Sequence, residues 1–141
     1  MKLRHLTLCF AFAASVLAAS VASADVELPK IFGNGMVLQR DLATPVWGWA
    51  EAGEEVTVEF GDQKKTATAT ANGTWSVKLD AQKENSKGQS LKVSGKNSIA
   101  INDVLIGDVW ICSGQSNMEW AVRNSLNPEE ELKAANYPNI R

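Results

Sequence analysis

A short stretch near the end of the chain, Gly114-Gln115-Ser116-Asn117, contains the residue types of a nucleophilic site. It follows an apolar run, Val109–Cys112, and precedes residues that suit the start of a helix. A serine between a strand and a helix stands at the carboxyl end of the strand, where free N–H groups of the first helical turn can face a developing oxyanion. Gly114 lets the backbone turn sharply, and the side chain of Asn117 can orient the loop.

The same serine has a structural interpretation. Ser116 and Glu119 have the spacing of a capping box, in which the two side chains satisfy the first amides of a helix. Spacing alone favours this role, because Ser-x-x-Glu is common before apolar helices. The stretch also differs from the Gly-x-Ser-x-Gly elbow of the α/β-hydrolases, because position 118 is Met.

Ser116 can act as a nucleophile only if a nearby group serves as its base. A serine hydroxyl needs a base to remove its proton, and histidine suits this task because its pKa lies near neutral pH. The sole histidine in the 141 residues is His5, close to the N-terminus. Lys133 is the nearest lysine after Ser116, and its position among glutamates indicates a solvated surface charge. We therefore expect these residues alone to lack hydrolytic activity.

The N-terminus has the layout of a secretory signal peptide. Two basic residues within the first four precede an apolar run over 6–21, which ends in the small residues Ala22-Ser23-Ala24. The run is shorter than the roughly 20 residues that cross a bilayer. We expect cleavage after Ala24 and export to the periplasm or the extracellular space, with no stable membrane anchor.

The part expected to remain after cleavage has few special groups. It would contain no histidine, and its only cysteine would be Cys112, so no disulfide would form within it. We interpret Cys112 as a buried structural thiol, because it lies in an apolar stretch. The whole chain has a formal net charge of −2, and this balance offers no basic footprint for nucleic acid. The sequence has no metal-ligand, phosphate-loop or cofactor motif, and we expect no cofactor.

Residues 25–106 predict a mainly β fold. Val56, Val58 and Phe60 alternate with polar residues, as in a half-buried strand. Asn72-Gly73 predicts a two-residue hairpin with a type I′ turn, in which both central residues have positive φ. Several such short runs, separated by turn residues, predict an antiparallel β-sandwich module over 25–106.

The pattern changes after residue 107. Val109–Cys112 is apolar at every position, as are strands of a parallel sheet with both faces covered. Asn127-Pro128 then marks the start of a helix that continues to about residue 135. We interpret 107–141 as the first strand-turn-helix unit of an α/β domain. Further sequence is expected after it, because a lone strand of this kind cannot pair its backbone groups.

One longer segment, Gly107–Trp120, closely resembles the nucleophile block of the sialate O-acetylesterase family, a branch of the SGNH-type esterases. Upstream segments agree with this resemblance: Leu28–Phe32, Gly35–Arg40, Pro45–Ala50 and Gly73–Trp75. The resemblance implies that Ser116 is the nucleophile of an acyl-enzyme mechanism and that its own backbone N–H lies in the oxyanion hole. It implies as well that the other oxyanion donors and the histidine base, in an Asp-x-x-His block, come from later parts of such enzymes, which this chain lacks.

The resemblance also implies a partner and an architecture. The partner would be an O-acetylated sugar, with Gly114, Gln115 and Asn117 binding substrate or orienting the loop. The fold would combine β-rich modules with an SGNH-type α/β domain, of which 107–141 would be the truncated start. The sequence leaves open the natural acetylated sugar and the oligomeric state.

Two alternatives remain at this point. One is a non-catalytic β-sandwich that binds glycans or a protein partner, and the other is an inactive truncated product that folds poorly. Trp47, Trp49 and Trp75 bear on the first alternative, because exposed indoles can stack on sugars. Trp47 and Trp49 share one strand face by period two, and we expect these tryptophans to pack mainly in the core.

Overall fold

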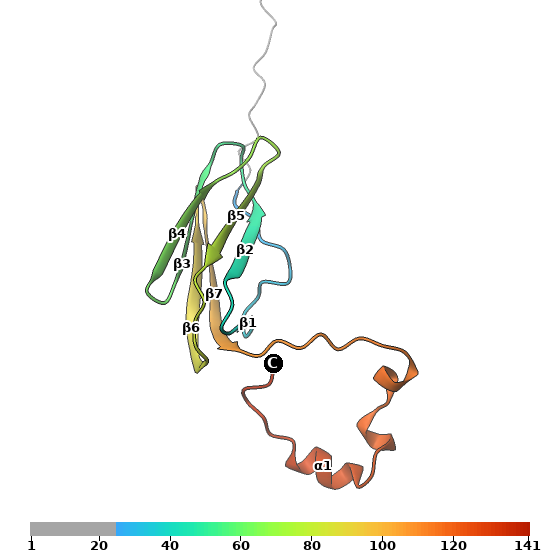
Figure 1. Cartoon of the computed structure of the whole chain (residues 1–141). Helices are drawn as coiled ribbons and strands as arrows, with labels where there is room; N and C mark the ends of the chain where they lie inside the picture. Colours follow the sequence, from blue (N-terminus) through green and yellow to red (C-terminus); the bar gives the residue numbers. More distant parts are fainter. Residues whose placement is uncertain (1–24) are drawn as a thin grey trace, which may run out of the picture.

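The computed structural model describes residues 25–141 as a two-sheet β structure followed by a tail that loops out and returns with its C-terminus near the β structure (Figure 1), where Arg141 forms an ion pair with Asp103 at 2.9 Å. The expected signal peptide over 1–24, its cleavage site and His5 lie outside the described residues. The mainly β fold predicted from the sequence is confirmed.

The larger sheet has five strands in the order β1-β7-β6-β3-β4. Their bounds are β1 Val37–Gln39, β3 Glu55–Phe60, β4 Gln63–Thr68, β6 Asn85–Ser94 and β7 Ser98–Gly107. Neighbouring strands are antiparallel, as predicted, except β1 and β7, which run parallel. Because parallel strands end at the same edge of a sheet, the chain leaves β1 and β7 side by side, with Gln39 opposite Gly107.

The smaller sheet consists of β2 (Thr44–Trp49) and β5 (Thr74–Leu79), which pair antiparallel. An isolated bridge joins Glu27 to Trp49 at the edge of β2. The backbone groups of these two residues exchange hydrogen bonds of 2.8 and 3.0 Å. The segment before β1 is thereby attached to the smaller sheet.

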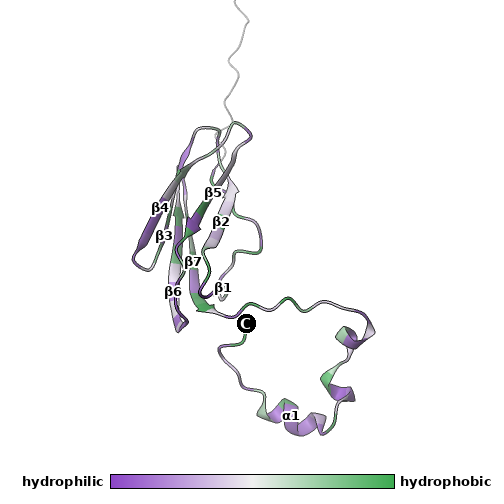
Figure 2. Cartoon of the chain, in the orientation of Figure 1, coloured by the Kyte–Doolittle hydropathy of each residue, from purple (hydrophilic) through white to green (hydrophobic). Residues whose placement is uncertain are grey.

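The hydrophobic core lies between the two sheets. Val56, Val58 and Phe60 of β3 are buried, as the alternating pattern predicts. Leu91 and Val93 of β6 lie opposite Phe60 and Val58 in the register, and they are buried too. The edge strand β4 is hydrophilic (Figure 2), and a charged edge of this kind discourages pairing with other chains.

Asn72-Gly73 forms a turn, but the predicted type I′ hairpin is wrong. Gly73 has a φ of 73°, whereas Asn72 is not among the residues with positive φ. The N–H of Gly73 donates to the oxygen of Thr70 at 2.9 Å. The turn connects β4 in the larger sheet to β5 in the smaller sheet, so its flanking strands do not pair with each other. Tertiary packing has thus overridden the local preference of the dipeptide.

The tight two-residue hairpin occurs instead at Gly61-Asp62. Phe60 of β3 pairs directly with Gln63 of β4 on either side of it. Gly61 has a φ of 60° at the first central position, as a type II′ turn requires.

The predicted strand at Val109–Cys112 is wrong. The run is not part of a strand, and Trp110 and Ile111 are 82% and 93% exposed. Within residues 25–141, β7 ends at Gly107 and no strand pairs with this run, whose backbone groups therefore lack the partners that a strand needs. Cys112, predicted to be buried, is exposed for the same reason.

The tail contains two short 3₁₀ turns, η1 (Ser116–Glu119) and η2 (Val122–Asn124), and one helix, α1 (Pro128–Ala134). Helix α1 confirms the helix predicted after Asn127, with proline in its first turn. The side chain of Asn127 makes no capping hydrogen bond. None of the side chains of α1 is buried. No helix within residues 25–141 is long and apolar enough to cross a membrane.

The substitution Gly48→Ala tests the attachment of the N-terminal segment. A β-carbon on Gly48 would overlap the backbone oxygen of Glu27, whereas one on Gly33 would meet nothing within 4 Å. We expect Gly48→Ala to lower the free energy of unfolding by about 1–3 kcal/mol, the usual cost of overpacking. Gly33→Ala should change it by less than about 0.5 kcal/mol. Urea denaturation of both variants measures the difference, and equal effects would contradict this account.

Candidate functional site

Ser116 lies in the tail as the first residue of η1. Its side chain is exposed, and its hydroxyl has no hydrogen-bond partner within the described residues. The residue at the N-cap position is Gln115, and no side chain caps the turn. The capping box expected from Ser116 and Glu119 is therefore not formed, and the hydroxyl of Ser116 is open to solvent.

The other residues of the predicted site lie around the same turn. The N–H of Met118 donates to the oxygen of Gln115 at 2.9 Å, and the N–H of Trp120 donates to the oxygen of Asn117 at 3.3 Å. A β-carbon on Gly114 would lie 2.8 Å from Cγ of Met118, so the glycine makes room for this side chain. Gly114, Gln115 and Asn117 are all exposed.

Within residues 25–141, no histidine accompanies the exposed hydroxyl of Ser116. Residues 25–141 contain no histidine, and the exposed Lys133 on α1 fits the solvated charge that the sequence indicates. A serine hydroxyl without a base attacks esters poorly at neutral pH. The tail therefore exposes the hydroxyl of Ser116 to solvent, and residues 25–141 hold no histidine that could act as its base.

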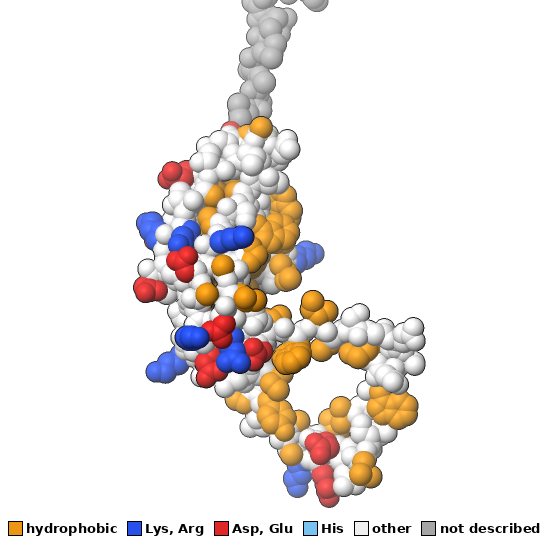
Figure 3. All heavy atoms as spheres, viewed as in Figure 1, with side chains coloured by type: hydrophobic (Ala, Val, Ile, Leu, Met, Phe, Trp, Pro, Cys, Tyr) orange, Lys and Arg blue, Asp and Glu red, His pale blue; other side chains and the backbone are white. Residues whose placement is uncertain are grey.

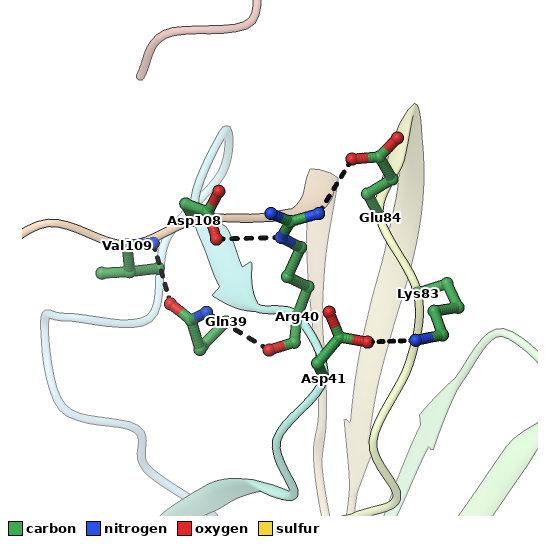
Figure 4. Close-up of polar contacts among 7 residues, drawn as sticks. All are labelled: Gln39, Arg40, Asp41, Lys83, Glu84, Asp108 and Val109. Carbon is green, nitrogen blue, oxygen red and sulfur yellow. Dashed lines mark hydrogen bonds and ion pairs between the residues drawn. The ribbon is translucent and has the colours of Figure 1, made fainter.

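A cluster of residues joined by polar contacts lies where the tail leaves the β module (Figure 4). We name it the junction cluster; its members are Gln39, Arg40, Asp41, Lys83, Glu84, Asp108 and Val109. The Nε of Arg40 donates to Oδ1 of Asp108 at 2.9 Å, and its guanidinium contacts Oε2 of Glu84 at 3.2 Å. The backbone N–H of Val109 donates to Oε1 of Gln39 at 2.9 Å.

The third ion pair of the junction cluster joins Asp41 to Lys83, with Nζ and Oδ1 2.6 Å apart. The backbone N–H of Asp41 donates to the oxygen of Gln82 at 2.8 Å. The hydrogen bond from Lys83 lowers the pKa of Asp41 below its ordinary value. The hydrogen bond to Asp108 raises the pKa of Arg40 above its ordinary value.

Sequence reasoning missed the junction cluster. The segment Gly35–Arg40 contributed to the resemblance, but its chemistry had no assigned role. The parallel pairing of β1 with β7 brings residues from distant parts of the sequence together, and no local pattern indicates that pairing. The available signal was the pair of polar residues, Gln39-Arg40, directly after the apolar residues Met36-Val37-Leu38.

A second candidate site is an aromatic cluster on the outer face of β2. The ring centroids of Phe32 and Trp47 are 6.4 Å apart and those of Trp47 and Trp49 are 5.6 Å apart, both pairs edge to face. Trp47 and Trp49 are 41% and 42% exposed. Figure 3 shows hydrophobic side chains gathered on the side of the module where β2 lies.

The core packing expected for the tryptophans is right for Trp75 and wrong for the two on β2. Trp75 is 3% exposed, and its Nε1 donates to the oxygen of Trp49 at 3.1 Å. Val46 and Gly48 take the inward positions of β2 and are buried. Because side chains alternate across a strand, Trp47 and Trp49 must face outward.

Comparisons with known proteins give related enzymes but no matching family model. The chain is 37% identical to rat sialate O-acetylesterase in a match of 121 residues, and the match covers 77% of this chain and 22% of the rat protein. It is 36% identical to the human sialate O-acetylesterase over 123 residues, 77% of this chain and 23% of that protein. The chain thus spans less than a quarter of the length of these curated relatives.

A solved structure agrees with these sequence matches. The crystal structure of a carbohydrate acetylesterase from Xanthomonas citri superposes with a TM-score of 0.76 and 36% sequence identity. The superposition covers 81% of this chain and 26% of that one.

The pair Asp41–Lys83 makes a pH-dependent contribution at the junction. A carboxylate whose folded pKa is lowered stabilises the fold fully above its unfolded pKa, near 3.8, and loses that contribution as the pH falls through the lower folded value. The contribution should be small, because both groups are exposed.

We expect Lys83→Ala to raise the pKa of Asp41 toward its ordinary value, since the donor that favours the carboxylate is removed. Carboxyl ¹³C NMR titration of Asp41 measures the change. Lys65→Ala is the matched control, because Lys65 pairs with Asp80 instead. An unmoved Asp41 titration in Lys83→Ala would show that the pair does not form.

Proposed function

We propose, on the premise that this chain is a homologue of the sialate O-acetylesterases, that it forms part of a serine esterase that removes O-acetyl groups from sugars. The observation that carries the proposal is the sequence match over 77% of the chain. The similarity to the carbohydrate acetylesterase structure supports the same chemistry. The resemblance noted in the sequence is confirmed by these matches, whereas the identity of the sugar and the catalytic mechanism belong to the proposal.

In the proposed mechanism, the oxygen of Ser116 attacks the carbonyl carbon of the acetyl group while a base removes its proton. The tetrahedral intermediate places negative charge on the former carbonyl oxygen, which the backbone N–H of Ser116 stabilises. The sugar oxygen then leaves and takes the proton, and an acetyl-serine remains. Water attacks this ester with the help of the same base, and acetate and free serine are released.

The base of this mechanism would come from a part of the enzyme outside this chain. Residues 25–141 contain no histidine, and the relatives are more than four times as long as the matched region. Residues 25–106 would act as the leading β module, and 107–141 would be the start of the esterase domain. The exposed apolar run Val109–Cys112 suits a segment that a larger domain covers.

The proposed enzyme would be exported. The basic, apolar and small-residue pattern over 1–24 supports a signal peptide cleaved after Ala24. The enzyme would then act on acetylated sugars in the periplasm or outside the cell. No metal or cofactor enters the proposed reaction.

The chain alone should not hydrolyse acetyl esters. Without the base, we expect a rate at least about 10⁴-fold below that of a complete enzyme, the usual scale for losing a triad member. Release of acetate from an acetylated sugar, compared between the chain and its Ser116→Ala variant, measures this. Turnover that depends on Ser116 in the isolated chain would contradict the assignment of the base to another region.

A longer form of the protein carrying the base should be active. There, Ser116→Ala should abolish turnover, whereas Ser113→Ala, a matched control in the same exposed stretch, should retain most of it. Retained activity in Ser116→Ala would remove this serine as the nucleophile.

A second candidate function, sugar binding by the β module itself, is favoured by the outward position of the two β2 tryptophans. In the register, Trp47 lies opposite Ser76 and Trp49 opposite Thr74. Both of these hydroxyl residues are exposed. An aromatic row beside a hydroxyl row can stack on the apolar face of a sugar ring and hydrogen-bond its edge.

Fluorescence titration with an O-acetylated plant oligosaccharide tests this second function. If the β module binds the sugar, we expect Trp47→Ala to weaken binding about tenfold, or 1.4 kcal/mol. Trp120→Ala, which removes an exposed tryptophan of the tail, should leave the affinity unchanged. Equal affinities for both variants would rule out stacking on β2.

A further inference from the structure

The junction cluster joins three segments that are far apart in the sequence. They are the end of β1, the loop before β6 and the start of the tail (Figure 4). The parallel pairing of β1 with β7 explains the meeting, because both strands deliver their following residues to the same edge. Charged side chains of both signs gather where the tail departs (Figure 3).

Three consecutive residues, the last of β7 and the first two of the tail, each form a hydrogen bond with Gln39 or Arg40. The backbone N–H of Arg40 donates to the oxygen of Gly107 at 2.9 Å, which extends the ladder beyond the end of β1. The side chain of Arg40 then binds the carboxylate of Asp108 at 2.9 Å. The side chain of Gln39 accepts from the N–H of Val109 at 2.9 Å.

Further contacts orient the side chains of Gln39 and Arg40 themselves. The Nε2 of Gln39 donates to the oxygen of Arg40 at 3.2 Å, which leaves Oε1 as the acceptor for Val109. The guanidinium of Arg40 is shared between Asp108 and Glu84. A single exposed ion pair contributes little stability, but here backbone, amide and ionic contacts act on the same three residues.

We propose that Gln39 and Arg40 are positioning residues, which set the direction in which the chain leaves β7 toward Ser116. The consequence for catalysis rests on the proposed function, whereas the effect on the path of the tail does not. Ser116 follows Asp108 by eight residues, all of them outside regular strands. An unheld segment of that length would sample many directions, and misplacement of a nucleophile by about 1 Å can cost 10²-fold in rate.

Amide exchange of Val109 in the full chain tests the proposal directly. Gln39→Leu removes the acceptor at similar side-chain size, and Arg40→Ala removes the ionic contacts. We expect exchange of the Val109 amide to become about fivefold faster in Gln39→Leu, because a hydrogen bond of roughly 1 kcal/mol is lost. Gln39→Glu, which keeps an acceptor oxygen, should restore protection. The Val58 amide in the core reports whether each variant is folded.

The mobility of a spin label on Cys112 gives a second readout. Cys112 is the only cysteine in 25–141, so Cys9→Ser makes the label unique. We expect a more mobile label in Arg40→Ala, with partial recovery in Arg40→Lys. Lys83→Ala is the matched control, because Lys83 lies in the same cluster but binds Asp41 rather than the tail.

High salt distinguishes the ionic contact of Arg40 with Asp108 from the neutral hydrogen bond between Gln39 and Val109. At 1 M salt the Debye length is only about 3 Å, so the hold of Arg40 on Asp108 should weaken. The label in the wild-type chain should then move as it does in Arg40→Ala, while the neutral bond of Gln39 still protects Val109. A label insensitive to salt would contradict the ionic part of the hold.

The proposal is overturned if Gln39→Leu and Arg40→Ala leave Val109 exchange and label mobility as in the wild type while Val58 remains protected. Neither readout involves ester hydrolysis, so failure of the esterase proposal would not produce this result. Conversely, if the readouts change as expected but the chain proves unrelated to ester hydrolysis in any longer form, the positioning of the tail stands and only its catalytic purpose is lost.

Discussion

The parallel pairing of β1 with β7 is the constraint on which the described arrangement depends. The other neighbouring strands of the larger sheet are antiparallel, and antiparallel connections return the chain to the opposite edge. Parallel pairing alone brings the chain that leaves β1 beside the chain that leaves β7. The junction cluster, and with it the departure of the tail, exists because these two strand ends share one edge.

The smaller sheet obeys a different constraint, the alternation of side chains across β2. Val46 and Gly48 face the core, and Gly48 is needed there because the backbone of Glu27 approaches closely. The same alternation sends Trp47 and Trp49 outward, where they form an aromatic surface on a module whose core is already complete. A structural requirement at one face thus leaves two tryptophan side chains exposed on the other.

The tail combines an exposed serine with an exposed apolar run. Its helix and turns bury no side chain within the described residues, so the β module supplies the only packed core there. A packed module thus contacts the first residues of a segment whose own side chains are mostly exposed.

Local sequence determined the elements whose signals are local. The alternation of Val56, Val58 and Phe60 predicted β3, and Asn127-Pro128 predicted the start of α1, because strand period and helix initiation are set by neighbouring residues. The stretch around Ser116 could likewise be identified from residue types and from its resemblance to a known nucleophile block, although its role is still a proposal.

Tertiary structure alone decided the features that depend on distant partners. Asn72-Gly73 favours a tight hairpin, yet its flanking strands belong to different sheets, and Val109–Cys112 reads as a strand but finds no partner within residues 25–141. The contacts of Gln39 and Arg40 with 107–109 join residues about seventy positions apart. Hydrogen-bond partners and buried faces of this kind are set by the packing of whole sheets, which no local pattern encodes.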